Sequence, residues 1–302
     1  WTMKTIATFL CLCLALQSYA QSDTLYVGIG SNIAKNNENK GLLIALTTYL
    51  SQKLNRPVKI ITDKTKAITD ACQQGKIDIA LLNTFGYVLG AETKAIEPLL
   101  VIADAQGKPI AYQSFIGAHP STGIKTMEQL REKAGQYEFM FVNPASTSGH
   151  LIPRLHLDQI DLQPDLSFAN IVYGETHLQT LQKIASGEAK VGASSFTDYE
   201  ALVKEGKIGK DKINILWKSE PIVNGPIAVR KSLPDAQKKQ IKEVFEKLPA
   251  DNAPLQQKLR KIWHNTTEET SYVAAKDQFY DPIRKMADSI EELLIVMELQ
   301  DE

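Results

Sequence analysis

Three hydroxyl residues in a row precede a glycine in the segment FVNPASTSGHLIPRL, residues 141–155. Apolar residues flank the hydroxyl run on both sides, so the pattern predicts a strand followed by a helix. Backbone N–H groups without intrahelical partners and the positive end of the helix dipole coincide at such a junction. The hydroxyls of Ser146, Thr147 and Ser148 would add donors there, and Gly149 would allow close approach to the backbone. This order of residues is suited to binding an oxyanion.

The same residues also fit a purely structural role. Serine and threonine are favoured N-caps, so one hydroxyl capping the helix, with the others in a loop, explains the pattern as well. Pro153 means that the helix is kinked or begins no earlier than about Ser148. The pattern alone leaves both interpretations open.

Other chemistries have weaker support in the sequence. GIGSNI begins like a dinucleotide-binding fingerprint, but Ile33 stands at the place of the third glycine. A phosphate-cradling G-x-x-x-x-G-K-[ST] loop is absent, and GASSF ends in Phe196 instead of the glycine of a nucleophile elbow. No H-x-x-x-H spacing of a zinc protease occurs among the five histidines, at positions 119, 150, 156, 177 and 264. We therefore expect neither a metal nor a cofactor.

Strand and helix patterns alternate along the chain. Strand patterns lie at 25–30, 58–62, 77–82 and 99–103, and again at 135–142, 169–174, 189–195 and 213–219. Helical patterns lie at 41–54, 67–74, near Tyr87, at 177–187, at 234–248 and at 281–297. Such alternation predicts an α/β fold with parallel strands joined by crossover helices, and a mostly helical C-terminal part.

Two extended stretches, 107–118 and 216–230, bracket the middle third of the chain. If both cross between domains, the middle third is a lobe of its own and the C-terminal part completes the first lobe. We expect lobe 1 to comprise 23–110 and 225–302, and lobe 2 to comprise 111–224. The result is a two-lobed α/β protein with two crossover strands as its hinge and a cleft between the lobes.

The composition is that of a water-soluble globular protein, with 43% hydrophobic and 23% charged residues in 302. A net charge of −1 provides no overall field that would attract nucleic acid or an acidic membrane, and we expect no nucleic-acid partner. Residues 1–20 read as a secretory signal peptide with two extraneous leading residues before Met3. Cys72 is the single cysteine after it, so we expect no internal disulfide.

The leucines that precede Cys11 and Cys13 do not fit a lipoprotein cleavage site, so we do not expect a lipid anchor. The rest of the chain has no apolar run of the ~18 residues that a membrane span needs. We therefore expect a mature protein that is soluble and periplasmic or secreted.

Several segments together resemble the periplasmic phosphonate/phosphite/phosphate-binding proteins of ABC transporters. FVNPASTSGHLIP is similar to the Asp-Pro-x-Ser-Thr-Ser-Gly-x-Leu-x-Pro signature of that family. The resemblance continues in GKIDIALLNTFGYVLG, AYQSFIGAHP, YGETHLQTLQKIASGEAKVGA and LWKSEPIVNGPIAVRKSLP, which cover much of the chain after the signal. It implies the type II periplasmic binding fold, a small anionic ligand, an ABC permease as partner and a monomer.

The resemblance also implies which residues bind the ligand. Ser146, Thr147 and Ser148 would donate hydroxyl and N–H bonds, with Gly149 beside them, and His177 and Tyr112 would each add a donor. Thr65 stands where the family has a tyrosine before a short helix, so it is expected to cap that helix, to face the anion, or both. Further candidates at lower rank are Tyr87, Ser195 and Asn224.

Two departures from the family pattern bear on the ligand. Gly225 replaces an acidic residue of the second crossover, and Ser195 aligns with a carboxylate often found after the VGA strand. In relatives that bind aminoalkylphosphonates such acids hold the ammonium group. Their loss implies a ligand without a cationic tail.

The sequence therefore predicts an exported solute-binding protein, not an enzyme, that captures a phosphonate, phosphite or phosphate between its lobes. One alternative is a ligand-sensing module for a membrane receptor with the same fold. Another is an exported enzyme in which Ser148 and His177 meet, although no carboxylate is evident to orient the imidazole.

Overall fold

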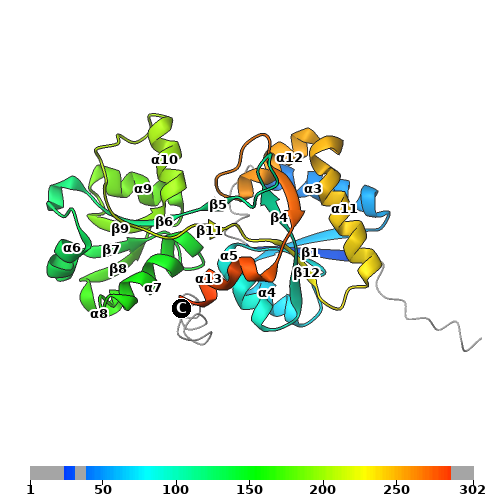
Figure 1. The fold of residues 1–302 in the computed structure, drawn as a ribbon, viewed down its shortest axis with the longest axis horizontal. Coiled ribbons are helices and arrows are strands. Elements are labelled where there is room, and N and C mark those ends of the chain that lie inside the picture. Colours follow the sequence, from blue (N-terminus) through cyan, green and yellow to red (C-terminus); the bar gives the residue numbers. More distant parts are fainter. Residues whose placement is uncertain (1–23, 31–38, 287–302) are drawn as a thin grey trace, which may run out of the picture.

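Two α/β lobes joined by a pair of short strands make up the computed structural model, which describes residues 24–30 and 39–286 (Figure 1). The first lobe takes its elements from both ends of the described chain. From the N-terminal side these are β1 (Leu25–Gly30), α3 (Asn39–Leu54), β2 (Val58–Asp63), α4 (Thr65–Gln73), β3 (Ile79–Leu81), α5 (Thr84–Glu92) and β4 (Ile96–Ala103). From the C-terminal side they are β12 (Ile227–Arg230), α11 (Asp235–Asp251), α12 (Ala253–Leu259), η4 (Arg260–Ile262), β13 (Ser271–Ala274), η5 (Asp277–Tyr280) and α13 (Asp281–Arg284).

The sheet of the first lobe has the strand order β13-β4-β12-β3-β1-β2. β1 pairs in parallel with β2 and β3, as the strand and helix alternation predicts. β12 inserts between β3 and β4 and is antiparallel to both. β13 adds an antiparallel edge strand beside β4. The sheet is therefore mixed, and its C-terminal strands differ from the mostly helical C-terminal part predicted from the sequence.

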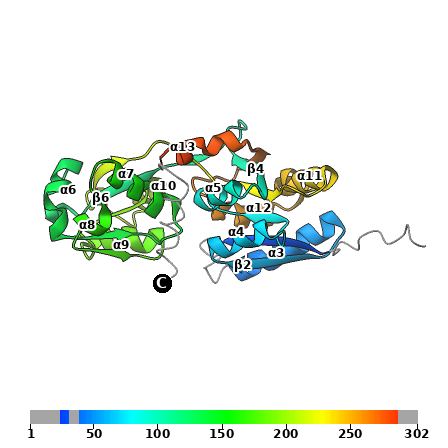
Figure 2. The ribbon, with the colours of Figure 1, turned by 90° about the horizontal axis from the view of Figure 1, so that it is seen from below.

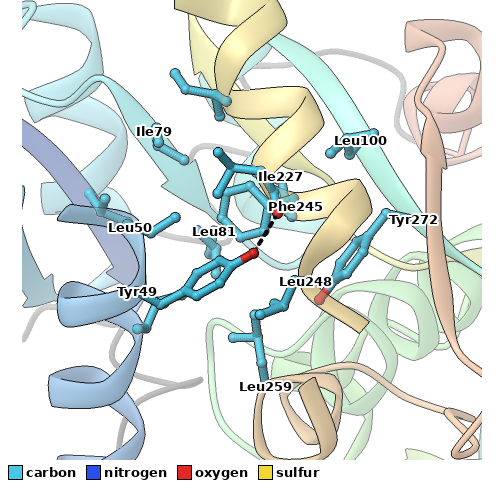
Figure 3. Close-up of a cluster of buried hydrophobic side chains, with 14 of the residues drawn as sticks. Tyr49, Leu50, Ile79, Leu81, Leu100, Ile227, Phe245, Leu248, Leu259 and Tyr272 are labelled. Atoms are coloured by element: carbon cyan, nitrogen blue, oxygen red, sulfur yellow. Dashed lines mark hydrogen bonds between the residues drawn. The ribbon is translucent and has the colours of Figure 1, made fainter. Parts of the chain in front are cut away.

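An apolar core fills the space between this sheet and helices α3 and α11 (Figure 3). Tyr49 and Leu50 project into it from α3, and Phe245 and Leu248 project from α11. The Tyr49 hydroxyl donates to the backbone carbonyl of Val244 at 3.0 Å, so the one polar atom of that ring has a partner inside the core.

The second lobe is formed by a continuous segment in the middle of the chain. Its strands are β6 (Ser114–Ala118), β7 (Glu138–Phe141), β8 (Asn170–Tyr173), β9 (Val191–Ser195) and β10 (Asn214–Lys218), in the order β10-β6-β9-β7-β8. Around them lie η1 (Pro120–Thr122), α6 (Met127–Lys133), η2 (Ala134–Gln136), η3 (Thr147–Leu151), α7 (Ile152–Gln159), α8 (Pro164–Ser167), α9 (His177–Ser186) and α10 (Phe196–Lys204). Gly187 ends α9 in the left-handed conformation.

The connection between the lobes is a two-stranded ribbon. β5 (Ala111–Tyr112) and β11 (Ile222–Val223) pair antiparallel, with Tyr112 opposite Ile222. Figure 1 shows both strands between the green lobe and the blue and orange lobe. The two crossings are adjacent, which is the arrangement expected of a hinge.

The lobes also share an apolar contact beside this ribbon. Leu151, Ile152 and Leu155 of the second lobe belong to one buried cluster with Phe85 and Tyr280 of the first. In Figure 2 the red helix α13 lies along the side of the molecule where this contact forms, next to α7. The two lobes are therefore packed against each other, and the residues between them are largely shielded from water.

Some sequence predictions fall partly or wholly outside the described residues. The predicted signal peptide at residues 1–20 lies outside them, and of the helix predicted at 281–297 only the start, α13, is described. Within the described ranges no helix combines the length and the apolar character of a membrane span. Cys72 is buried in the first lobe.

Gly225 lies where the second crossing returns to the first lobe, at a place where a side chain would not fit. A Cβ atom there would lie 2.0 Å from the backbone oxygen of Leu82 and 2.5 Å from the carbonyl carbon of Asn83. The indole N–H of Trp263 donates to the Gly225 carbonyl at 2.9 Å and holds the strand in this position. An acidic side chain at 225 is therefore incompatible with this packing.

We expect Gly225→Ala to lower the free energy of unfolding by at least about 1–3 kcal/mol, because backbone atoms that cannot rotate away must move. Gly41→Ala is the matched control, because a Cβ at Gly41 in α3 would meet no atom within 4 Å. There alanine should stabilise the helix by about 0.5–1 kcal/mol. Urea denaturation measures both, and equal stability of the two variants would contradict the proposed close contact.

Candidate anion-binding site

The hydroxyl-rich loop follows β7 and begins the helical segment η3, a single π-helical turn that continues into α7. Ser146 is the N-cap, and its Oγ accepts the N–H of Gly149 at 2.9 Å. A Cβ on Gly149 would lie 2.3 Å from a methyl carbon of Val142. The glycine is thus needed for packing of the turn on the end of β7, a different reason from the ligand approach proposed from the sequence.

Capping by Ser146 leaves the other two hydroxyls for other partners. The Thr147 Oγ1 accepts the backbone N–H of Phe85, in the first turn of α5, at 3.0 Å. The Asn83 side chain, which caps α5, donates across the lobes to the Ala145 carbonyl at 2.7 Å. The Ser148 side chain is 1% exposed, and its Oγ has no hydrogen-bond partner among the described residues. The N-termini of α5 and η3 therefore face each other across the lobe boundary.

Tyr112 reaches the same place from the ribbon between the lobes. Its hydroxyl is in hydrogen-bonding contact with the side chains of Thr84 and Thr147. Burial raises the pKa of Tyr112 to about 12, so its phenol keeps its proton and remains a donor near neutral pH. The structure thus brings Tyr112, a predicted ligand contact, close to Thr147.

His177 begins α9 after the N-cap Thr176, and its ring lies beside Ser146 with Nε2 3.5 Å from Oγ. Its Nδ1 accepts the backbone N–H of Ser195 at 3.1 Å and lies 2.9 Å from the Ser194 hydroxyl. Because an amide can only donate, Nδ1 carries no proton and the neutral ring carries it on Nε2. Burial lowers the pKa of His177 to about 4, with an opposing effect from Asp198. His177 is therefore a neutral donor that faces the loop.

Two residues that sequence reasoning missed complete the group. Asp198, in the first turn of α10, lies with Oδ2 3.9 Å from His177 Nδ1 and 3.2 Å from His264 Nδ1. His264 belongs to the first lobe, and its ring stacks on Tyr112 with centroids 4.3 Å apart. Burial would raise the pKa of Asp198, but attraction and a hydrogen bond from His264, and then His177 and Ser195, hold it well below its usual range.

The grouping of His177, Asp198 and His264 has the spacing of a metal site, since one ligand atom of each lies within 4.8 Å of the others. No sequence motif reveals it, because the residues come from three separate segments. The Nδ1 lone pair of His177 is already used by the Ser195 N–H, and a metal would have to break that bond. We therefore assign the group to hydrogen bonding and not to a metal.

Ser146, His177 and Asp198 also lie in the order of a hydrolase triad, in place of the Ser148 and His177 pair considered from the sequence. A triad requires an unprotonated Nε2 to accept the serine proton and an Nδ1–H that donates to the carboxylate. Here Nδ1 accepts from Ser195 and Nε2 carries the proton, which is the opposite tautomer. This geometry does not support nucleophilic catalysis.

Of the remaining predicted residues, two support this group through hydrogen bonds and two have other contacts. Ser195 caps α10 and holds His177, and Asn224 holds His264 through bonds to its backbone N–H and carbonyl. Thr65 is the first residue of α4, after the N-cap Lys64, so it is not the cap; its methyl group lies against Gly86 of α5. Tyr87 is not brought to the group, because its hydroxyl donates to Asp277 at 2.6 Å and its ring packs on Tyr280.

Two α/β lobes, each built on its own mixed β-sheet, with polar groups converging from both lobes, define a periplasmic binding protein fold. The family of ABC transporter, phosphonate, periplasmic substrate-binding proteins matches residues 38–280, most of the chain. The protein belongs to this family. Its members are binding components of transporters and not enzymes.

Solved structures with the same fold share little sequence with this chain. A binding protein component of an ABC phosphonate transporter from Pseudomonas aeruginosa is 22% identical, with 92% of this chain and 94% of that chain covered and a TM-score of 0.68. A Prochlorococcus marinus protein in complex with methylphosphonate is 16% identical, with 89% and 99% covered and a TM-score of 0.67. A Xanthomonas citri protein bound to ATP is 18% identical, with 90% and 98% covered and a TM-score of 0.70.

We expect His177 to remain neutral, with its proton on Nε2, from about pH 8 down to about pH 5, because a lowered pKa delays protonation on acidification. Long-range ¹H–¹⁵N correlation spectra of the imidazole report both the tautomer and the titration, and His177→Asn assigns the signals. Titration near the ordinary histidine pKa of about 6.5, or a proton on Nδ1, would contradict the assigned hydrogen bond from Ser195.

Proposed function

We propose that this substrate-binding protein captures a small phosphorus oxyanion, a phosphonate, phosphite or phosphate, between its two lobes for delivery to an ABC permease. The proposed ligand contacts are the hydroxyls and N–H groups of Ser146, Thr147 and Ser148, the Nε2–H of His177 and the hydroxyl of Tyr112. The methyl group of Thr65 lies against Gly86 in α5, the helix whose start faces this group. Gly149, Ser195 and Asn224 position the ligand contacts.

The observation that carries the proposal is the meeting of two helix N-termini from opposite lobes. The first N–H groups of a helix have no intrahelical acceptor, and the dipole places positive potential there. At present the Thr147 hydroxyl accepts the Phe85 N–H of α5, and it belongs itself to the first turn of η3. Facing N-termini repel each other, and an anion between them would remove that repulsion.

Ser148 supports the same interpretation. A buried hydroxyl without a partner is destabilising, and native proteins keep few of them. A bound oxyanion would give the Ser148 hydroxyl the acceptor that the described residues do not. His177 is neutral and donates, so it can bind an anion without a change of protonation.

The number of donors is sufficient for binding in the range typical of nutrient uptake. A hydrogen bond to a charged group contributes roughly 1.5–3 kcal/mol. Five or six such bonds could support micromolar binding, about −8 kcal/mol, after the costs of desolvation and lobe closure are subtracted. Lobe closure is then a population shift that the ligand favours because it contacts both lobes.

The relatives limit the ligand only broadly. The similar structures carry methylphosphonate in one case and ATP in another, so the fold does not determine the ligand. Family membership and the compact donor set favour the phosphonate class. The permease partner, a monomeric state, and lobe boundaries at 23–110 with 225–302 and at 111–224 are further parts of the proposal.

We expect Ser148→Ala to weaken binding of the best ligand among methylphosphonate, phosphite and phosphate by about 10- to 150-fold, the value of one charge-assisted hydrogen bond. Because the Ser148 hydroxyl has no partner among the described residues, the stability of the unliganded protein should stay the same or rise. Isothermal titration and thermal denaturation measure the two quantities separately.

Ser186→Ala is the matched control, since Ser186 is exposed and its hydroxyl bonds backbone groups near the end of α9, the Lys183 carbonyl at 3.1 Å and the Glu188 N–H at 3.4 Å. It should leave affinity unchanged. Full affinity in Ser148→Ala would refute the site. Binding to none of the three anions, with binding to a non-anionic solute instead, would refute the function.

A further inference from the structure

A carboxylate lies beside the proposed anion site, next to His177. Asp198 follows the cap Ser195, whose Oγ accepts the Asp198 N–H at 3.2 Å, so the carboxylate is fixed at the start of α10. Its Oδ2 lies 3.9 Å from the ring of His177, a proposed ligand donor. A negative charge close to a bound anion is unfavourable unless a partner compensates it. The loss of acids at 225 and 195 therefore does not leave the site without one.

The protein supplies that partner from the other lobe. His264 Nδ1 lies 3.2 Å from Asp198 Oδ2 and 3.5 Å from Oδ1, and since a carboxylate only accepts, Nδ1 donates. Asn224 fixes the His264 backbone with bonds of 2.9 Å to its N–H and 3.1 Å to its carbonyl. The ring is therefore held in place on both sides.

The position of His264 matters as much as its chemistry. Its ring stacks on Tyr112 at 4.3 Å and meets the His177 ring edge to face at 5.2 Å. It thus lies against both of the aromatic side chains that we expect to hold the anion, and lines the site beside them. A tetrahedral anion whose oxygens face the hydroxyl loop directs its substituent away from that loop, and the imidazole occupies space on that side.

We propose that His264 takes the place of a ligand tail, pairing with Asp198 across the lobes so that the protein accepts oxyanions with small substituents and rejects those with an aminoalkyl tail. This inference rests on the proposed function and specifies its ligand class. The carboxylate that could attract an ammonium group is present, but it is satisfied by the protein itself. A tail would have to displace a ring that is held by stacking and hydrogen bonds.

Three ligands separate the effect of tail length from that of tail charge: methylphosphonate, propylphosphonate and aminoethylphosphonate. The last two have tails of equal length, and only the last carries an amine. By isothermal titration the unchanged protein should bind methylphosphonate about 100-fold tighter than either longer ligand. In His264→Ala this gap should narrow to about tenfold or less, and aminoethylphosphonate should bind about tenfold tighter than propylphosphonate because Asp198 is uncovered. The double variant Asp198→Asn with His264→Ala should lose the preference for aminoethylphosphonate but should still bind ligands with the longer tails.

His119→Ala is the control, because His119 is a half-buried histidine that caps η1 in the second lobe. It should leave all three affinities unchanged. His264→Asn provides a second test if His264→Ala does not fold, since it shortens the side chain and keeps an N–H donor. Thermal denaturation identifies variants that have only lost stability, because such a loss would weaken all three ligands alike and leave their ratios unchanged.

Unchanged ratios in both folded His264 variants, or tight binding of aminoethylphosphonate by the unchanged protein, would overturn this inference and leave the proposed function intact. Failure of the unchanged protein to bind methylphosphonate, phosphite and phosphate would overturn the proposed function itself.

Discussion

The hydrogen bond from the Phe85 N–H to the Thr147 hydroxyl joins the starts of two helices that belong to different lobes. Most of the arrangement around it follows from the need to hold those two helix ends together. Asn83 caps one helix and reaches the loop of the other, and Tyr112 approaches the same hydroxyl from the ribbon. Each contact satisfies a polar group that would otherwise be buried without a partner. The lobes thus meet at the N-terminal ends of two helices, where the helix dipole places positive potential.

Apolar packing beside this polar contact gives the closed arrangement a stability of its own. Leu151, Ile152 and Leu155 pack with Phe85 and Tyr280 in one cluster that spans the lobes. A ligand therefore does not have to provide all of the free energy of closure, because burial of these side chains supplies part of it. Under the proposed function, an anionic ligand would add the difference in free energy between a site with repelling helix ends and one in which their charge is neutralised.

Local patterns were sufficient for most of the elements and for the loop, but not for the residues that the loop contacts. The helical faces of α3 and α11 follow from their spacing of apolar residues, and Gly187 marks the end of α9. β13 escaped prediction because a short edge strand has little pattern of its own.

The limits were the same at the candidate site. Asp198 and His264 are 66 residues apart, and neither stands in a motif, so only the tertiary fold brings them together. Sequence reasoning took the absence of acids at positions 225 and 195 to imply a ligand without a cationic tail. It did not consider Asp198, whose carboxylate follows Ser195 in the first turn of α10.

The insertion of β12 between β3 and β4 has a consequence for how the chain folds. Its partner strands precede it by about 130–150 residues, with the whole second lobe in between. The first sheet therefore lacks its central strand β12 until the chain beyond the second lobe is available. The second lobe is continuous and can form its sheet from its own segment, whereas the first depends on contacts of high sequence separation, which form slowly. Until then β3 and β4 expose unpaired edges, the kind of surface that promotes wrong association between chains. The topology therefore favours completion of the second lobe before the first, because only the first lobe needs strands from both ends of the described chain.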